Sequence, residues 1–219
     1  MARLRKSARL WKPESRAAAQ HALVRDDGVY FTIDPLAIFG RRAPLEIEIG
    51  AGKGEFIIAR AAQNPAHDFL AVELSSIIAR LLATRCGGAN LPNLRVARMD
   101  ARTLVNLMLP DASIAAYHIY FPDPWPKERH VKHRLFTPYL VHSLARTLDP
   151  EGSLFVATDV ADYADLIFAM LAAGGFARGS DEAPGGRCSG FARKYLAAGK
   201  PVYSAAFTRA PAAAQTASA

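Results

Sequence analysis

Short apolar runs alternate with longer amphipathic stretches over most of the chain. The runs predict strands at residues 45–49, 69–73, 94–98, 115–121, 153–158 and 202–207. The stretches between them predict helices at residues 55–63, 75–85, 136–148 and 163–173. Strands that alternate with helices favour an α/β fold with a doubly wound, mostly parallel sheet and helices on both faces. Because such sheets bind ligands at the carboxyl ends of their strands, functional residues should follow directly after each strand.

The two ends of the chain lack this pattern. Residues 1–25 are basic and weakly patterned, and residues 210–219 are small and low in complexity. The Arg-rich start is compatible with a transit peptide, but a basic N-terminal arm is the simpler interpretation. We therefore expect an arm at residues 1–25, one domain at residues 26–209 and a disordered tail.

Charge and cysteine usage narrow the class of protein. The net charge of +7 favours a polyanionic partner such as a nucleic acid, because Lys and Arg neutralise phosphates. Cys86 and Cys188 lie far apart and outside any metal-binding spacing, which indicates reduced thiols and no metal. No apolar run reaches the length of a membrane span, so we expect a cytoplasmic protein.

A glycine-rich loop follows the first predicted strand. It reads Gly50-Ala51-Gly52-Lys53-Gly54, and Gly50 and Gly52 are candidate cofactor-binding residues because glycine permits a tight turn and close approach to a ligand. The G-x-G-x-G spacing differs from the loop of nucleoside triphosphate sites and matches the dinucleotide pattern only in part.

Acidic residues lie at the ends of three successive strands. Glu48 is placed to hold the ammonium group of a cationic, phosphate-free cofactor, and Glu73 to accept hydrogen bonds from a ribose diol. Asp100 follows the third strand, where an adenine edge would lie. Each acid alone could equally cap a helix or occupy a turn, but three together at this edge favour a nucleoside-cofactor site.

The segment after the fourth strand carries the most specific chemistry. Prolines 122 and 124 flank Asp123 and stiffen the loop that presents its carboxylate. Trp125 offers a flat face for a base, and a basic run follows at residues 127–134. A solvated turn and a core tryptophan are the plainer alternatives, but the position next to Asp123 favours a substrate site.

At these residues the sequence resembles the bacterial tRNA (guanine-N7)-methyltransferase family. The family's most distinctive segment matches residues 121–134, and residues 45–54 and the Thr158-Asp159 pair agree in order and spacing. The resemblance covers roughly residues 25–208. It implies a Rossmann-like class I methyltransferase fold and S-adenosyl-L-methionine as cofactor. It also implies methylation of the variable-loop guanine at position 46 of tRNA.

The resemblance also implies roles for single residues. Glu48, Glu73, Asp100 and Asp123 correspond to cofactor-side positions, and Asp123 is also the catalytic residue by this comparison. Lys127, Asp159, Ser189 and Phe191 correspond to substrate-binding positions. Where the family has a glutamate in its last substrate-binding stretch, this chain has Ala192, so we expect weaker activity or a replacement acid such as Glu182.

Guanine N7 carries a lone pair and no proton, so no general base is needed. We therefore expect Asp123 to bind the guanine edge and to stabilise the positive charge that develops on the ring. Trp125 would receive the base, and Arg129, Lys132 and Arg134 would contact the RNA backbone. The sequence leaves open a monomer or a homodimer.

Two other functions remain open at this point. The glycine loop and Glu73 also fit a small-molecule methyltransferase or a nucleotide-dependent oxidoreductase, although the basic run argues against a small substrate. Ala192 also permits an RNA-binding module with an inactive methyltransferase fold, although the intact acids argue against it.

Overall fold

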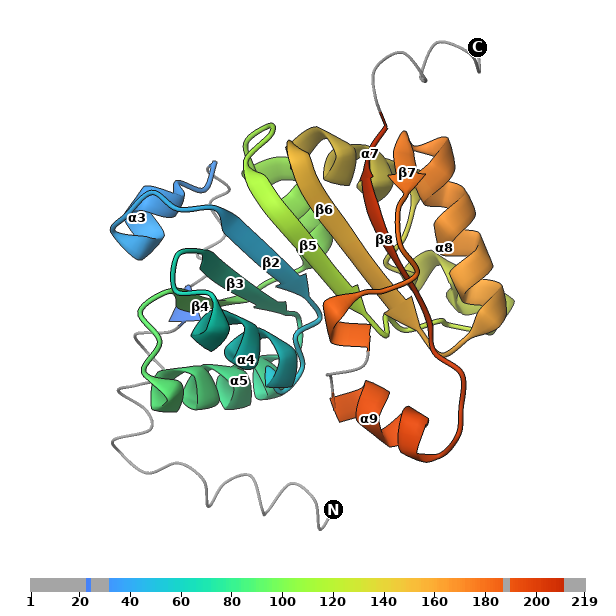
Figure 1. The fold of residues 1–219 in the computed structure, drawn as a ribbon, viewed down its shortest axis with the longest axis horizontal. Coiled ribbons are helices and arrows are strands. Elements are labelled where there is room, and N and C mark those ends of the chain that lie inside the picture. The colour runs from blue at the N-terminus through green and yellow to red at the C-terminus, as the bar shows by residue number, and fades with distance from the viewer. Residues whose placement is uncertain (1–22, 25–31, 187–189, 211–219) are drawn as a thin grey trace.

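The computed structural model describes residues 23–24, 32–186 and 190–210, which form one eight-stranded sheet with helices on both faces (Figure 1). The strands are β1 (Leu23–Val24), β2 (Leu45–Ile49), β3 (Asp68–Glu73), β4 (Leu94–Arg98), β5 (Ile114–Tyr120), β6 (Leu148–Thr158), β7 (Phe176–Arg178) and β8 (Tyr203–Arg209). Their order is β1-β4-β3-β2-β5-β6-β8-β7, and the pairs are parallel except the two that include β8. Because the chain runs outward from β2 to β4 and then returns to β5, the switch point lies between β2 and β5.

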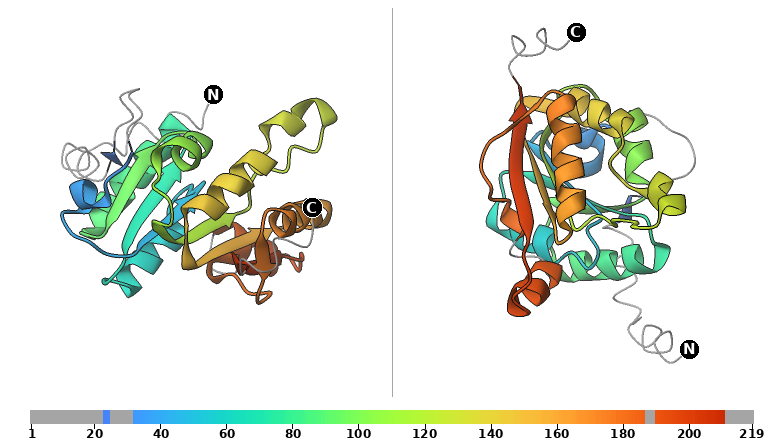
Figure 2. Two further views of the ribbon diagram at one scale, coloured as in Figure 1. Left: turned by 90° about the horizontal axis from the view of Figure 1, so that it is seen from above. Right: turned by 90° about the vertical axis from the view of Figure 1, so that its right-hand side faces the viewer.

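The helices divide between the two faces of the sheet. They are α3 (Pro35–Phe39), α4 (Glu55–Gln63), α5 (Ser76–Ala89), α6 (Ala101–Thr103), α7 (Pro138–Thr147), α8 (Ala161–Ala173) and α9 (Gly190–Ala197), with short turns η1 (Leu104–Met108), η2 (Glu128–His133) and η3 (Pro184–Gly186). One buried cluster joins the sheet to α7 and α8, and a second joins it to α4 and α5. Figure 1 shows α4 and α5 together over β2, β3 and β4, and Figure 2 shows α8 beside β8. The doubly wound α/β prediction is confirmed.

The predicted strands and helices are present, three of them with unchanged bounds. These are β2, α4 and β4. Helix α7 begins at Pro138 rather than at residue 136. Thr137 caps it by accepting a hydrogen bond from Leu140 N at 3.1 Å, and Pro138 occupies the first turn, where its missing N–H costs nothing.

Strand β6 is longer than its apolar run predicts. It begins at Leu148, which pairs with Ile114, whereas Ser153 pairs with Ala116. The register shift between these pairs places residues 149–152 in an irregularity of the strand. The sequence Asp-Pro-Glu-Gly resembles a turn, so the pattern alone places the start of the strand too late.

Strand β1, helix α3 and strand β7 are among the short elements that were not predicted. They are two, five and three residues long, which is too short for a clear period. Leu23 and Val24 belong to the expected N-terminal arm and pair with β4. The rest of residues 1–25 and the tail beyond residue 210 lie outside the described residues, so their expected disorder stays a prediction. None of the described helices is long and apolar enough to cross a membrane.

Candidate active site at the carboxyl edge of the sheet

The glycine loop turns sharply at the carboxyl end of β2. Gly50, Gly52 and Gly54 have φ angles of 76°, 56° and 73°, in the left-handed region that favours glycine. At Gly54 a Cβ atom would also lie 2.3 Å from Leu82 Cδ1 of α5. The amides of Gly50 and Ala51 donate to Val72 O of β3, at 2.9 and 3.1 Å. These contacts hold the loop against the end of β3.

Glu73 holds the same loop through its carboxylate. It accepts hydrogen bonds from Gly52 N at 3.2 Å and from Ser75 N at 2.9 Å. A carboxylate has about four lone-pair sites, so these two bonds leave acceptor capacity for a diol. Glu73 therefore has the position and chemistry predicted for the ribose contact.

Glu48 is a buried acid with an incomplete set of partners. Its side chain is 4% exposed, and its Oε2 atom has no hydrogen-bond partner among the described residues. Burial raises its pKa to about 8; the charge of Glu73 adds to this, and the backbone of Ile57 opposes it by hydrogen bonding. An acceptor left without a donor at a ligand-binding edge fits a cationic ligand group.

Asp100 caps a helix, which was the alternative to cofactor binding for this acid. Its Oδ1 accepts from Arg102 N at 2.8 Å as the N-cap of α6, and its Oδ2 forms an ion pair with Arg102 at 2.7 Å. The side-chain hydrogen bond from Arg102 lowers the pKa of Asp100. Asp100 is half-buried, so its adenine contact remains a prediction.

The loop that carries Asp123 is strained and braced. Phe121 and Trp125 have positive φ angles of 52° and 40°, which non-glycine residues rarely adopt and which recur at functional sites. Asp123 is exposed between them. Arg134 supports this loop through two contacts. Its Nε donates to Pro124 O at 2.8 Å, and its guanidinium lies 5.2 Å from the ring centre of Tyr163 on α8.

Trp125 packs against two histidines from η2. The ring centres of His130 and His133 lie 5.5 and 5.4 Å from that of Trp125. The indole is half-buried, so it remains partly accessible beside Asp123. In the left view of Figure 2, this yellow-green segment projects beyond the sheet.

The predicted RNA-binding cations of this segment fall into two groups. Lys127, Arg129 and Lys132 are exposed. Arg134 is half-buried and engaged by Pro124 and Tyr163, a bracing role that the sequence did not indicate. Its predicted contact with the RNA backbone would have to use the part of the guanidinium that does not contact Pro124 and Tyr163.

Asp159 follows β6, on the same edge of the sheet as Asp123. It is half-buried, and its charge, together with hydrogen bonding to the phenol, raises the pKa of Tyr195 of α9. Ser189 lies outside the described residues, and Phe191 is described only as part of the α9 backbone. Ala192 is fully buried, at 0% exposure, and Glu182 is exposed on a separate loop.

A buried ionic network lies beside the site and was not predicted. Glu46 of β2, 1% exposed, accepts from Arg60 Nε at 3.0 Å and Nη2 at 3.1 Å, and it contacts His67 Nδ1 and His118 Nε2, each at 2.8 Å. Burial would raise the pKa of Glu46, but bonds from His118 and Arg60 dominate and lower it to about 2. Burial lowers the pKa of His118, so its neutral ring donates from Nε2 and accepts from Tyr120 at Nδ1.

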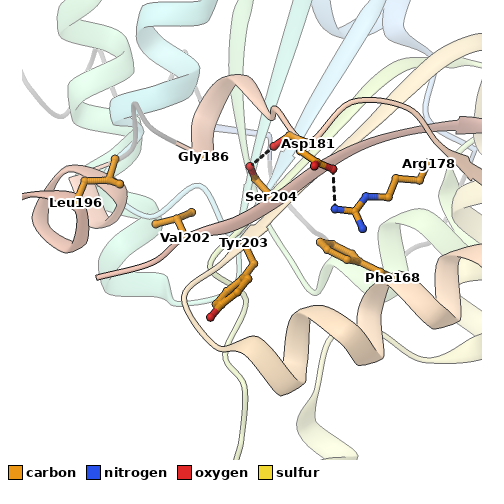
Figure 3. Close-up of a pocket in the computed structure, with 8 residues that line it drawn as sticks. All are labelled: Phe168, Arg178, Asp181, Gly186, Leu196, Val202, Tyr203 and Ser204. Carbon is orange, nitrogen blue, oxygen red and sulfur yellow. Dashed lines mark hydrogen bonds and ion pairs between the residues drawn. The ribbon is translucent and has the colours of Figure 1, made fainter. Parts of the chain in front are cut away.

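A cavity of about 260 Å³ lies on the other side of α9 (Figure 3). Leu196, Val202 and Tyr203 line one end, and the other residues of its wall are Phe168, Arg178, Asp181, Gly186 and Ser204. Arg178 forms an ion pair with Asp181 at 2.7 Å. Tyr203 pairs with Thr158, so the cavity adjoins the end of β6, directly before Asp159.

Comparison with known proteins decides the family. A family model described as "Putative methyltransferase" matches residues 42–186. A tRNA (guanine-N(7)-)-methyltransferase of Nitrosomonas europaea is 40% identical over 156 residues, which are 70% of each chain. The chain belongs to the tRNA (guanine-N7)-methyltransferase family. Proteins with the same name from Syntrophotalea carbinolica and Paracidovorax citrulli are 39% and 44% identical over 68% and 64% of this chain.

The match to these two relatives of the tRNA (guanine-N7)-methyltransferase family is partial in length. It covers 64% of the Syntrophotalea protein and 57% of the Paracidovorax protein. Solved structures agree with the fold alone. The 16S rRNA methyltransferase KamB has a TM-score of 0.57 at 17% identity and covers 84% of this chain and 96% of its own. A SAM-dependent methyltransferase of Aquifex aeolicus has a TM-score of 0.54 at 12% identity and covers 88% and 97%. The class I methyltransferase fold is thus confirmed.

Proposed function

We propose that this protein transfers a methyl group from S-adenosyl-L-methionine to N7 of the variable-loop guanine of tRNA, at position 46. The observation that carries the proposal is the convergence of Asp123, Asp159 and the glycine loop on one edge of a methyltransferase sheet, beside exposed cations. Relatives at 37–44% identity carry this activity in their names.

The donor set suits S-adenosyl-L-methionine, which is cationic and carries no phosphate. The buried Oε2 of Glu48 lacks a partner among the described residues, and an ammonium group would supply one. Glu73 has acceptor capacity for the ribose hydroxyls and is fixed by two amides. A pyrophosphate would instead meet the charge of Glu73 and an acceptor oxygen of Glu48 with no donor, which argues against the oxidoreductase alternative.

When bound, the cofactor supplies a methyl group on a positively charged sulfur. The protein then has to orient a guanine, because N7 already holds the lone pair that reacts. Asp123 would accept hydrogen bonds from guanine N1–H and the exocyclic amine, and its charge would stabilise the methylated ring. Asp159 would share that edge. The strained backbone around Asp123 fits a side chain that must hold one orientation.

The exposed cations would hold the tRNA while the base enters. Lys127, Arg129 and Lys132 lie on or beside η2, on the segment that projects from the sheet. Phosphate contacts there would fix the register of the RNA, while Asp123 and Asp159 would select the base. Trp125, packed on two histidines, would face a base that has left its stack.

The test is methylation of unmodified tRNA with labelled S-adenosyl-L-methionine, followed by nucleoside analysis. We expect 7-methylguanosine in the variable loop. Asp123→Asn keeps the size of the side chain and removes its charge, so it should lose most turnover and still bind S-adenosylhomocysteine. The proposal fails if the wild-type protein binds S-adenosylhomocysteine and leaves the tRNA unmethylated.

A further inference from the structure

Helix α9 lies beyond the carboxyl ends of β5 and β6, below the sheet in Figure 1. Its inner face carries Ala192 and, one turn later, Tyr195, since residues three apart share one face of a helix. Ala192 is fully covered and ends in a methyl group. Among the described side chains of this face, the polar one is Tyr195.

Tyr195 touches both loops that present acids at this edge. Its ring is parallel to that of Phe121, with an interplanar angle of 9° and 6.3 Å between ring centres. Its phenol faces Asp159, whose charge and hydrogen bonding raise the pKa of the tyrosine. Phe121 begins the loop that carries Asp123, so one side chain joins the Asp123 and Asp159 loops.

A third contact fixes the ring from the chain beyond the helix. The Lys200 ammonium lies 5.2 Å from the centre of the Tyr195 ring. Such a cation is attracted to the negative face of an aromatic ring. Contacts with Phe121, Asp159 and Lys200 leave the ring little freedom to rotate.

We propose that Tyr195 is a positioning residue for the target guanine, which orients the Asp159 carboxylate and supports the Phe121 turn that presents Asp123. This inference rests on the proposed function. A carboxylate has about four lone-pair sites, so a phenol bound to Asp159 leaves acceptor capacity for the N–H groups of guanine. The hydrogen bond selects one rotamer of Asp159 before the base arrives, which lowers the entropy cost of binding.

Tyr195→Phe separates the two parts of this role. It keeps the contacts of the ring with Phe121 and Lys200 and removes only the hydroxyl group that faces Asp159. We expect KM for tRNA to rise about fivefold, which corresponds to the loss of one ordinary hydrogen bond. KM for S-adenosyl-L-methionine and the Tm should stay unchanged. Tyr195→Ala also removes the stack on Phe121, and it should lower kcat in addition. Tyr139→Phe deletes the same hydroxyl at an exposed tyrosine of α7 and serves as the control.

The decisive readout is a double-mutant cycle with Asp159→Ala, which removes the acceptor as well as the charge. If the phenol acts through Asp159, Tyr195→Phe has little further effect on KM for tRNA in the Asp159→Ala background. Two independent, multiplying effects would overturn the proposal, as would a Tyr195→Phe variant with wild-type KM for tRNA.

A spectroscopic titration tests the contact without RNA. Asp159 raises the pKa of Tyr195, so Asp159→Asn should lower the pH at which this phenol ionises. Ultraviolet difference absorption follows the ionisation of the tyrosines. The signal of Tyr195 is identified by its loss in the Tyr195→Phe variant. An unchanged titration in Asp159→Asn overturns the inference whatever the substrate is. A shifted titration in a protein that methylates no tRNA would instead count against the proposed function alone.

Discussion

Glu46 and Glu48 lie two residues apart on β2, face the same side of the sheet and are 1% and 4% exposed. Glu46 lies within the strand and contacts Arg60, His67 and His118. Glu48 lies one pleat closer to the carboxyl edge and has an oxygen without a partner among the described residues. Their pKa values diverge accordingly, to about 2 for Glu46 and about 8 for Glu48.

This contrast distinguishes a structural acid from a binding acid. Burial alone penalises both charges, so the difference comes from the donors that each carboxylate receives. A saturated carboxylate has little capacity left for a ligand. An unsaturated one keeps an acceptor oxygen for a cationic group, and without that group it holds a proton up to a higher pH. Three measurements test this interpretation, from the largest expected effect to the smallest.

The largest effect should come from Glu46→Ala. The substitution leaves Arg60 and His118 without their shared acceptor in a buried setting, which costs about 3–5 kcal/mol in the free energy of unfolding. Urea denaturation at pH 7 measures it. Glu48→Ala, the matched change on the same face of β2, should lose far less stability. Equal losses for the two variants would contradict the assignment of Glu46 to structure and Glu48 to binding.

The sequence predicted the contrast only in part. The G-x-G-x-G spacing and the position at the end of a strand indicated Glu48, because ligand sites lie there in any doubly wound sheet. Glu46 was missed, although a second charge inside a strand of a buried parallel sheet already implies buried partners. Those partners, Arg60, His67 and His118, come from α4, the loop after it and β5, and only the folded chain brings them together.

The same limit applies to the rest of the fold and the site. The pattern of apolar residues predicted the strands of the central sheet. It did not predict β1 or β7, because these strands are too short to show a pattern. The motif indicated Asp123 and its cations but not that Arg134 braces Pro124. Nor did it indicate Tyr195, because a tyrosine on a short helix carries no signal until the fold brings it to Asp159.

The second effect should appear in cofactor affinity. Glu48→Gln keeps the shape of the side chain but replaces a charge that would bind the ammonium group, so Kd for S-adenosylhomocysteine should rise about 10- to 100-fold. Isothermal titration calorimetry at pH 8 measures it. Glu46→Gln is the control: provided that it remains folded, its affinity should stay near that of the wild type. If Glu48→Gln binds as tightly as the wild type, the free oxygen of Glu48 does not face the cofactor.

The smallest effect is the pH dependence of stability, and its sign differs between the two acids. The folded-state pKa of Glu48 is raised from 4.5 to about 8, so its proton favours the folded state. That stabilisation is complete below pH 4.5 and is lost as the pH rises toward 8. Glu46 has its pKa lowered from 4.5 to about 2, so its contribution is complete above pH 4.5 and is lost as the pH falls through that interval.

A comparison of the wild type with Glu48→Gln isolates the contribution of Glu48 to the pH dependence of stability. The titration of His118 and of the other groups is common to both proteins. Between pH 6.5 and 8 the wild type should lose about 1 kcal/mol more than Glu48→Gln, since one pKa unit corresponds to about 1.4 kcal/mol and the shift is reduced by relaxation. Urea denaturation without cofactor at both pH values measures the difference. Parallel pH profiles would mean that Glu48 is ionised in the folded protein and has a donor like those of Glu46, which would remove the contrast between the two acids.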